Sequence, residues 1–519
     1  MEFTAAGIFN RAITIERTNT DIYKTQKETD VYVNGEKVLT TDRNVFTLAD
    51  LEPDQDVTVK IDDVSHTFHT RKETVKLNVK DFGAKADGKT DDTNAIQAAI
   101  MNCPKDGSVY VPAGTYFVRP LFLRSNMTLY MDKDAELLGD PDRNHYPLLP
   151  GMVQGTDEKS EYSFSSWEGN PLTSFASLIT AVDCENTTII GGTLNGNADN
   201  SDWWDNHKKK RIAWRPNTIF FNQCQNMTVS HVTVKNSPCW TIHPYYSDHL
   251  KFMDLYIQNP YNSPNTDGFD PESCTDVLLL GTRISVGDDC VAIKSGKIYM
   301  ATAHCKPTRD VTIRNCDFER GHGSVTVGSE IAGGVYNVNI DQCLFDSTDR
   351  GVRIKTRRGR GQRSVLDQIQ FDHVMMKNVP MAMTFNMFYY CDPDGHSAYV
   401  QDQNYHEPDD MTPAIGTISV KNVTVTGADS AFLCAYGLPE KPIGKIELEN
   451  VDASFLPEEE LKEGCPIMMD NFEPVRGVGI WAGNVDTLSM KNVVIRHALV
   501  HTQLKNITNK DLDSLSFED

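Results

Sequence analysis

The chain has 519 residues, of which 50 are basic and 72 acidic, and its formal net charge is −22. This length allows a sizeable core in several domains or in one large repetitive domain. The negative charge argues against a nucleic-acid or anionic-membrane partner, and no run approaches the ~18 apolar residues of a membrane span.

The N-terminus and the cysteines bear on the compartment of the protein. The opening MEFTAAGIFNRAITIERT lacks the basic start and the long apolar stretch of a secretory signal. The 12 cysteines have no paired spacing, and several lie in apolar runs, where cysteine behaves as a small buried hydrophobe. We therefore expect a cytoplasmic protein, or a secreted one if a signal peptide has been removed.

The first 72 residues predict a small β-sandwich. VYVNGEKVLTT forms a hairpin pattern around Asn34-Gly35, and FTLADLEPDQDVTVKI alternates as a strand does. The run Leu51-Glu52-Pro53 resembles the strand-entry corner of fibronectin type III domains, with Val57 where those domains usually carry tyrosine. We predict a fibronectin type III-like domain over 1–72 and a second domain over 73–519.

A single amphipathic helix is predicted over about 92–103. Thr90 or Asp91 is a suitable N-cap. The apolar residues recur at helical spacing, at Ile96, Ala99, Ile100 and Cys103. Such a stripe must cover another apolar surface, so we expect this helix to close one end of the domain that follows.

From residue 126 onward, short strands share one pattern: a polar residue, an apolar one, any residue, an apolar one. It occurs as NMTL at 126, NTTI at 186, NMTV at 226, HLKF at 249, DVLL at 276, DVTI at 310, NVNI at 337 and QIQF at 368. Between 226 and 368 the intervals run from 23 to 34 residues. This period and the lack of helix predict an all-β solenoid, a right-handed parallel β-helix.

The repeat also explains two groups of residues that could suggest other functions. Asn126, Asn186 and Asn226 begin Asn-x-Thr sequons, but they occupy the same coil position, so the repeat explains them better than glycosylation does. The cysteines near the first strands of successive coils predict stacked buried thiols and no metal site, because no close Cys or His partner accompanies them; they are Cys224, Cys316 and Cys343.

Polar clusters recur at similar phases of four consecutive coils. Counted from the start of its coil, Asp267 lies at 18, Asp288 and Asp289 at 12 and 13, His322 at 12, and Arg353 and Lys355 at 16 and 18. Equivalent positions in neighbouring coils stack about 4.8 Å apart, so these side chains should form one patch. Each cluster alone could be a turn or a solvated surface. Their ordered recurrence predicts a convergent site.

These motifs carry a resemblance to a known family. NTDGFD at 265–270, GDDC at 287–290, GHG at 321–323 and RIK at 353–355 look like the four signatures of the polygalacturonases of glycoside hydrolase family 28. The resemblance covers about residues 75–500. The extended GSEIAGGV and TDRGVRIKTRRGRG segments and the front domain resemble the exo-acting bacterial branch.

The resemblance implies a role for each site residue. Asp288 is the general acid, while Asp267 and Asp289 position and deprotonate the water, with inversion at the anomeric carbon. His322 tunes or holds the acid. The residues implied to bind substrate are Arg353, Lys355, Asn265, Lys294 and Arg357. Crowding three aspartates should also keep one of them protonated well above the ordinary carboxyl pKa of about 4. Neither a metal nor another cofactor is expected.

The expected partner is an acidic polysaccharide such as galacturonan, because RIKTRRGRGQR puts local positive charge in an acidic chain. Segments 140–215 and 385–415 could wall off one end of a cleft. Trp203, Trp204, Tyr245 and Tyr246 are candidates for stacking on sugar rings, whereas Trp240 is expected in the core. The alternatives are a hydrolase of rhamnogalacturonan or xylogalacturonan, a pectate lyase, and a non-catalytic carbohydrate-binding solenoid. The sequence leaves the oligomeric state open.

Overall fold

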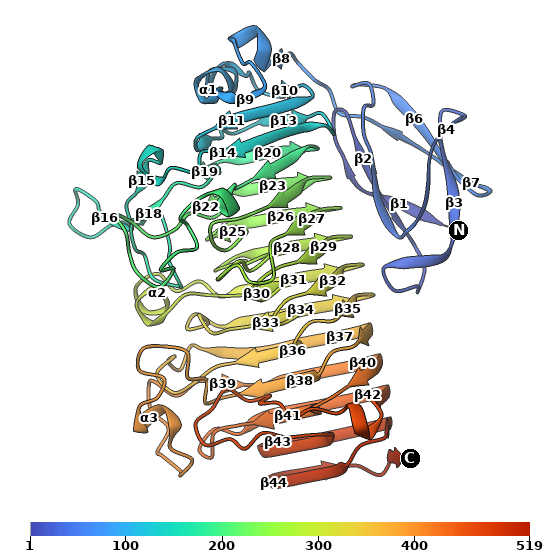
Figure 1. Cartoon of the computed structure of the whole chain (residues 1–519), viewed down its shortest axis with the longest axis vertical. Coiled ribbons are helices and arrows are strands. Elements are labelled where there is room, and N and C mark those ends of the chain that lie inside the picture. Colours follow the sequence, from blue (N-terminus) through green and yellow to red (C-terminus); the bar gives the residue numbers. More distant parts are fainter. Residues whose placement is uncertain (1) are drawn as a thin grey trace.

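A computed structural model describes residues 2–519 as a tall stack of short strands with a small sandwich beside it (Figure 1). The sandwich consists of two antiparallel sheets. One contains β1 (Phe3–Ile8), β2 (Ile13–Arg17) and β5 (Val45–Leu48), and the other contains β4 (Glu36–Arg43), β3 (Lys24–Val33), β6 (Asp56–Ile61) and β7 (Val64–His69). The alternation of β6 buries Val57, Val59 and Ile61 between the sheets.

The stack is a right-handed parallel β-helix with three walls, as predicted. Its first wall contains β8 (Lys76–Asn78), β10 (Gly107–Val111), β13 (Met127–Met131), β20 (Glu185–Ile190), β23 (Gln225–Ser230), β26 (Asp248–Met253), β28 (Thr275–Leu280), β31 (Thr308–Arg314) and β34 (Val335–Asp341). Its second wall contains β9 (Asp87–Asp91), β11 (Gly114–Val118), β14 (Ala135–Gly139), β21 (Thr193–Asn195), β24 (Thr233–Lys235), β27 (Tyr256–Gln258), β29 (Arg283–Ser285), β32 (Asp317–Arg320) and β35 (Leu344–Asp346).

The third wall carries the predicted polar motifs in the middle of the stack. It contains β12 (Leu121–Phe122), β19 (Ile179–Val182), β22 (Ile219–Asn222), β25 (Ile242–Tyr245), β30 (Val291–Ile293), β33 (Val325–Val327), β36 (Arg350–Lys355), β38 (Met381–Asn386) and β41 (Ala431–Tyr436). In the last coils, longer strands cover more than one wall: β37 (Val365–Lys377), β39 (Ala414–Ile415), β40 (Thr417–Ala428), β42 (Ile443–Phe455), β43 (Val478–Arg496), β44 (Val500–Asp511) and β45 (Leu515–Glu518).

The polar residue that begins each predicted repeat has a backbone reason to be there. Asn126, Asn186 and Asn226 have φ angles of 62°, 53° and 55°, and His249 and Asp276 have 56° and 57°. This left-handed region is most accessible to short polar side chains and glycine. The asparagine amides also form a ladder, in which Asn186 Nδ2 donates to Asn126 Oδ1 and Asn226 Nδ2 to Asn186 Oδ1.

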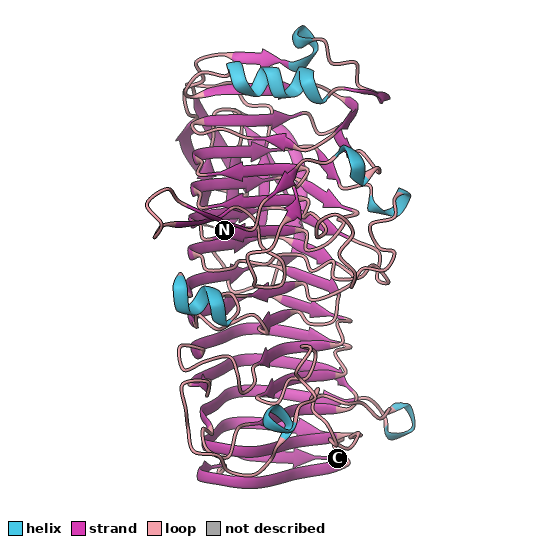
Figure 2. Cartoon of the chain, turned by 90° about the vertical axis from the view of Figure 1, so that its left-hand side faces the viewer, coloured by secondary structure: helices cyan, strands magenta, loops and turns pink. Residues whose placement is uncertain are grey.

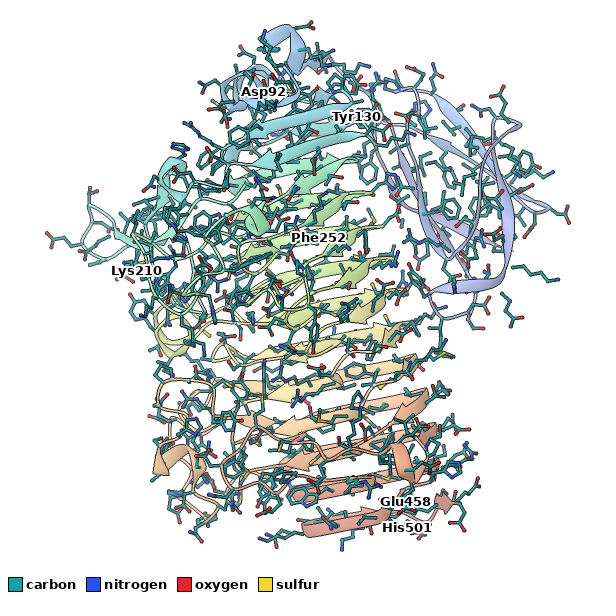
Figure 3. The ribbon with its side chains drawn as sticks, viewed as in Figure 1. Asp92, Tyr130, Lys210, Phe252, Glu458 and His501 are labelled. Atoms are coloured by element: carbon teal, nitrogen blue, oxygen red, sulfur yellow. The ribbon has the colours of Figure 1, made fainter. Side chains whose placement is uncertain are left out.

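Apolar side chains fill the interior of the stack, with Phe252 among them (Figure 3). The predicted cysteine column is part of this core. Cys224, Cys316 and Cys343 are free thiols with no exposed surface. Seen from the side, the strands form parallel layers along the whole height of the molecule (Figure 2).

Helix α1 (Thr93–Asn102) lies across the end of the stack that carries β10 and β11, and buries Ile96, Ala99 and Ile100, as expected (Figure 1). The expected N-cap was wrong, because Thr90 and Asp91 belong to strand β9 and the helix is preceded by Asp92. The carboxylate of Asp92 instead accepts hydrogen bonds from the backbone of Lys85 and Ala86.

The remaining elements lie in loops outside the three walls. They are the 3-10 turns η1 (Val79–Phe82), η2 (Arg143–His145), η3 (Ala198–Asn200) and η4 (Glu458–Glu460), the strands β15 (Leu148–Leu149), β16 (Met152–Gln154), β17 (Glu161–Ser163) and β18 (Ser174–Phe175), and the helices α2 (Ile298–Ala303) and α3 (Ala398–Gln401). Among residues 2–519, no helix has the length and apolar character needed to span a bilayer.

Candidate active site

The third wall places the predicted polar motifs on neighbouring coils at matching positions. A column of paired residues runs through four coils: Phe269, Val291, Val325 and Val352. Asp267 and Asp289 each lie two residues before their member of this column, and Asp288 and His322 each lie three residues before theirs. The shared offsets bring residues that are far apart in the chain onto one wall.

The three predicted acids form one cluster. Oxygens of Asp267, Asp288 and Asp289 lie within 4.8 Å of one another. Asp267 and Asp289 are 4% and 1% exposed, whereas Asp288 is only half-buried. Asp288 is therefore the carboxyl of the cluster that solvent and ligands reach most easily.

Asp289 is held by the two cations of the RIK motif. Arg353 Nη1 donates to Oδ1 at 2.9 Å and Lys355 Nζ donates to Oδ2 at 3.0 Å, with both cations themselves buried. Burial raises the pKa of Asp289, but Lys355 and Arg353 outweigh it and hold this pKa well below the ordinary value. Asp289 is thus a carboxylate throughout the neutral range.

The surroundings of Asp267 shift its pKa in the opposite direction. Burial, followed by the negative charges of Asp288 and Asp270, raises the pKa of Asp267 well above its ordinary value. Burial likewise raises the pKa of Asp270, against the opposing charge of Lys294. The Lys294 ammonium is 3.4 Å from Asp270 Oδ1 and 3.9 Å from Asp267 Oδ2, so one cation faces two acids.

One crowded aspartate was expected to keep its proton, and the structure indicates which carboxyl groups have the raised pKa. The raised pKa values belong to Asp267 and Asp270, the deeply buried acids, whereas the half-buried Asp288 is the residue implied to be the general acid. Oxygens this close share their protons as a group.

His322 lies on the coil after Asp288, and its backbone N–H donates to the Asp288 carbonyl at 2.9 Å. Its Nδ1 is 2.7 Å from Asp349 Oδ2. This hydrogen bond, against the opposing effect of burial and with help from Asp288, raises the His322 pKa above its ordinary value. The imidazole therefore gains positive charge beside the most accessible acid.

Two predicted substrate-binding residues already have protein partners. The Asn265 side-chain oxygen accepts a hydrogen bond from Arg215 Nη2 at 2.7 Å. Arg357 pairs with Asp392 at 2.9 Å and with Asp394 at 2.7 Å. Arg353, Lys355 and Lys294 contact the acid cluster directly, whereas the guanidinium of Arg357 contacts acids of the 385–415 segment.

The expectation for the aromatic residues was partly wrong. Trp203 and Tyr245 are 0% and 1% exposed, so neither offers a face to a sugar. Trp203 packs edge-on against Tyr146 and Phe175 in a separate apolar cluster. Trp240, expected in the core, is 6% exposed, but the Lys294 ammonium lies 4.1 Å from its ring centroid.

Sequence reasoning missed two acids of the site. Asp270 was seen in the NTDGFD motif without being assigned a role, and Glu330 lies in the GSEIAGGV segment. Glu330 Oε2 is 3.2 Å from Lys294 Nζ, and although burial opposes it, Lys294 lowers the Glu330 pKa well below its ordinary value. The sequence around Asp270 and Glu330 does not indicate these contacts, because their partner Lys294 lies on another coil.

The two long segments predicted to close one end meet next to this charge network. The backbone N–H of Lys297 donates to the Gly169 carbonyl at 2.8 Å, and its Nζ is 3.3 Å from Asp392 Oδ1. Gly169 belongs to segment 140–215 and Asp392 to segment 385–415. Lys297, only three residues after Lys294, therefore ties both segments to the edge of the wall.

The acid cluster also has the donor set of a metal site. Its oxygens could hold a divalent cation, since oxygen ligands suit Mg²⁺ and Ca²⁺. However, both oxygens of Asp289 already accept hydrogen bonds from Arg353 and Lys355, and Lys294 faces Asp267. Side-chain cations thus supply the positive charge here, and the residues fit a metal poorly.

Carboxyl groups of unlike pKa, side by side on the wall of a parallel β-helix and flanked by cations, suit a glycosidase that acts on an acidic sugar. Residues 154–435 match the model of the glycosyl hydrolases family 28, and residues 76–159 match that of rhamnogalacturonase A/epimerase, pectate lyase-like proteins. The chain belongs to glycosyl hydrolases family 28 and is a polygalacturonase-type glycoside hydrolase.

Similar proteins agree with this assignment. A probable polygalacturonase of Vitis vinifera is 31% identical over 385 residues, which cover 72% of each chain. The exopolygalacturonase of Thermotoga maritima superposes with a TM-score of 0.64 at 25% identity, covering 82% of this chain and 93% of that one. A family 28 exopolygalacturonase of Yersinia enterocolitica has the same fold, with a TM-score of 0.62 at 18% identity over 100% of this chain and 98% of that one.

Proposed function

We propose that this protein hydrolyses the α-1,4-galacturonosyl linkages of pectate and oligogalacturonides, acting from a chain end. The observation that carries the proposal is the juxtaposition of Asp267, Asp288 and Asp289 with the buried cations Arg353 and Lys355. The acids supply glycosidase chemistry, and the cations favour a substrate that carries carboxylates.

Each residue has a role in this reaction. Asp288, the accessible acid, protonates the leaving glycosidic oxygen, and Asp289 and Asp267 position and deprotonate the attacking water. His322 holds Asp288 in place and returns its proton. Arg353 and Lys355 bind a galacturonate carboxylate as well as Asp289, while Lys294 extends the positive surface towards Glu330.

The stereochemical outcome is proposed from the family resemblance. Inverting glycosidases usually separate their carboxyl groups by about 6.5 to 9.5 Å, and the acid oxygens here lie closer together. Inversion therefore requires the water to lie beside the cluster, with Asp288 turned towards the sugar. Proton NMR of the first product tests this point, because inversion of an α-linkage releases the β-anomer.

Action from a chain end is supported by the closed side of the site. Lys297 joins Gly169 and Asp392, so the two long segments meet within three residues of Lys294. In this proposal, the junction stops a polymer from continuing past this side of the site. A time course on polygalacturonate should give monomer or dimer from the outset, whereas a ladder of intermediates would show internal cleavage.

The main test of the proposal is the Asp288→Asn variant. We expect turnover of polygalacturonate to fall by at least ~10²-fold, the usual contribution of a general acid, while substrate binding is retained. Asp486→Asn, an exposed aspartate of β43, is the matched control and should keep full activity. A non-catalytic carbohydrate-binding solenoid would show no turnover in the unmodified protein.

The same assay separates the remaining candidates. A pectate lyase is the second candidate, because residues 76–159 match a pectate lyase-like family model. A lyase would form an unsaturated product that absorbs ultraviolet light, whereas a hydrolase forms new reducing ends without it. Rhamnogalacturonan and xylogalacturonan, offered in parallel with polygalacturonate, test the related backbones.

A further inference from the structure

A groove separates the N-terminal sandwich from the outer face of the first wall. It consists of two adjoining hollows, of about 620 Å³ and 170 Å³. The groove is lined by residues from Asn126, in the coil of β13, to Thr312 in β31. It therefore follows six successive coils, a length of about 24 Å at about 4.8 Å per coil. The opposite side is formed by Phe9, Arg71 and Lys72 of the sandwich and its linker.

The groove is distinct from the acid cluster. It borders β20, β23 and β26 of the first wall, whereas the site residues Asp288 and His322 precede β30 and β33 of the third wall. The loops with α2 lie on the side of the stack away from the sandwich (Figure 1). A ligand in the groove therefore does not occupy the position of the reacting sugar.

The floor of the groove is a row of hydroxyl groups. Thr128 pairs with Thr188, and Thr188 pairs with Thr228, each on the next coil, and Thr312 lies in the same register two coils beyond Lys251. Among residues 2–519, none of these four hydroxyls has a hydrogen-bond partner. Free hydroxyls on three consecutive coils, with a fourth beyond Lys251 and Leu278, suit a ligand that itself carries several hydroxyl groups.

The charges of the groove are mainly positive, although the chain as a whole carries −22. Two side chains of the groove already have protein partners: His249 Nδ1 lies 2.7 Å from Asp276 Oδ2, and Arg314 Nε lies 2.7 Å from Glu16 Oε1. Arg71, Lys72 and Lys251 are exposed and form no ion pair with any described residue, and Asp106 is the one acid facing them that stays unpaired.

The sandwich that forms one side of the groove is firmly docked. Thr14 Oγ1 is 2.8 Å from Ser230 Oγ, and Asn10 Nδ2 donates to Ser108 Oγ at 2.6 Å. Phe9 packs with residues of both parts in one apolar cluster, which includes Tyr130 at the junction (Figure 3). The groove therefore keeps its shape without a ligand, which reduces the entropy lost on binding.

We propose that this groove is a second binding site for an acidic oligosaccharide segment, which holds the polymer while its end is cleaved on the third wall. The identity of the sugar as a polygalacturonate rests on the proposed function. Arg71, Lys72 and Lys251 pair with its carboxylates, and the threonine row hydrogen-bonds with its hydroxyls. Because these cations are exposed, the binding is weak and decreases with salt.

The test uses the full chain in the Asp288→Asn background, which binds without cleaving. Native gels cast with polygalacturonate should retard this protein, and Arg71→Glu with Lys251→Glu should reduce the retardation severalfold. The control is Lys441→Glu with Lys510→Glu, which reverses the same number of charges away from the groove. Both lysines are exposed and form no ion pair among the described residues. It should be retarded like its parent.

The catalytically active versions provide the second measurement. For long polygalacturonate, KM should rise severalfold in the groove variant, and the rise should disappear with a dimer, which is too short to reach both sites. Thermal unfolding shows whether the variants are folded. Equal retardation and equal KM for the groove variant and its control would overturn the proposal.

The outcomes also separate this inference from the proposed function. The protein could hydrolyse polygalacturonate while the groove variant is retarded as strongly as its parent. This result would overturn the second site and leave the catalytic assignment standing. Conversely, the groove variant could lose its retardation while the unmodified protein hydrolyses no galacturonan. This result would overturn the catalytic assignment and leave the groove as a binding site.

Discussion

At the scale of the residue, the site separates three neighbouring carboxyl groups by what surrounds each of them. Asp289 faces Arg353 and Lys355 and is ionised, whereas Asp267 is buried among other acids and its pKa is raised. Placing groups of unlike pKa side by side is how acid and base functions coexist at one pH. The half-buried Asp288 is the acid of the cluster that a sugar can reach.

The histidine at the edge of the cluster gives a prediction about pH. The hydrogen bond that His322 Nδ1 donates to Asp349 is the largest contribution that raises the His322 pKa, so Asp349→Asn should lower this pKa towards about 6.5. The imidazolium is lost as pH rises through its pKa, so the alkaline limb of the kcat/KM profile should move to lower pH. Asp486→Asn serves as the control, and an unmoved limb would show that His322 does not govern it.

At the scale of the element, the strands could be predicted from the sequence because each repeat begins with a residue suited to a left-handed turn. Asn126, Asn186 and Asn226 have positive φ angles, and the apolar positions that follow them enter the core. The acid partners of Lys294 could not be predicted in the same way. Asp270 and Glu330 come from different coils, and only the register brings them to one ammonium.

The aromatic residues show a second limit of local sequence. Trp203 was a candidate for stacking on sugar rings, yet it is fully buried beneath Arg143, whose guanidinium lies 4.4 Å from the Trp203 ring centroid. The loop that carries it forms its own small apolar cluster with Tyr146 and Phe175. Such satellite clusters have no periodicity, so no sequence pattern reports them.

Helix α1 gives a prediction for an element that closes the stack. Ile100 is 0% exposed, whereas its neighbour Met101 is 61% exposed on the same helix. Ile100→Ala should lower the free energy of unfolding by about 2 to 5 kcal/mol, the usual cost of such a truncation in a core. Met101→Ala should leave it nearly unchanged.

The measurement for this pair is the urea midpoint, followed by far-UV circular dichroism. Activity on a short oligogalacturonide should be unchanged in both variants at low denaturant, because the acid cluster lies many coils away from α1. Equal midpoints for the two variants would show that α1 does not protect the end of the stack.

At the scale of the whole molecule, the sandwich and the β-helix act as one body through a compact interface. Arg43 bridges the two parts, with its guanidinium 2.7 Å from Asp254 and hydrogen-bonded to the Gly281 carbonyl. Burial raises the pKa of Asp254, but the charge of Arg43 and the hydrogen bond with His231 together keep this pKa below the ordinary value. A depressed pKa stabilises the folded state above about pH 4, and this contribution is lost as the pH falls further.

A pair of glycines tests how closely the two parts must approach. Gly281 has φ +62° and a Cβ added there would lie 2.4 Å from the Cβ of Val45, whereas Gly35 has φ +89° with open space around it. Alanine strains the backbone at both positions, by about 1 kcal/mol. Only Gly281→Ala also forces the sandwich away from the first wall, because the Cβ of Val45 is fixed to its backbone and cannot rotate aside.

We therefore expect Gly281→Ala to increase the radius of gyration in small-angle scattering and to speed amide exchange in β5 and β28, while Gly35→Ala changes neither. Undocking also widens the groove beside the sandwich, so retardation by polygalacturonate should weaken in Gly281→Ala but not in Gly35→Ala. Cleavage of a galacturonate dimer depends on the third wall alone and should persist in both. If scattering and exchange were unchanged in Gly281→Ala, a local shift would have relieved the contact with Val45. The rest of the interface would then hold the sandwich in place.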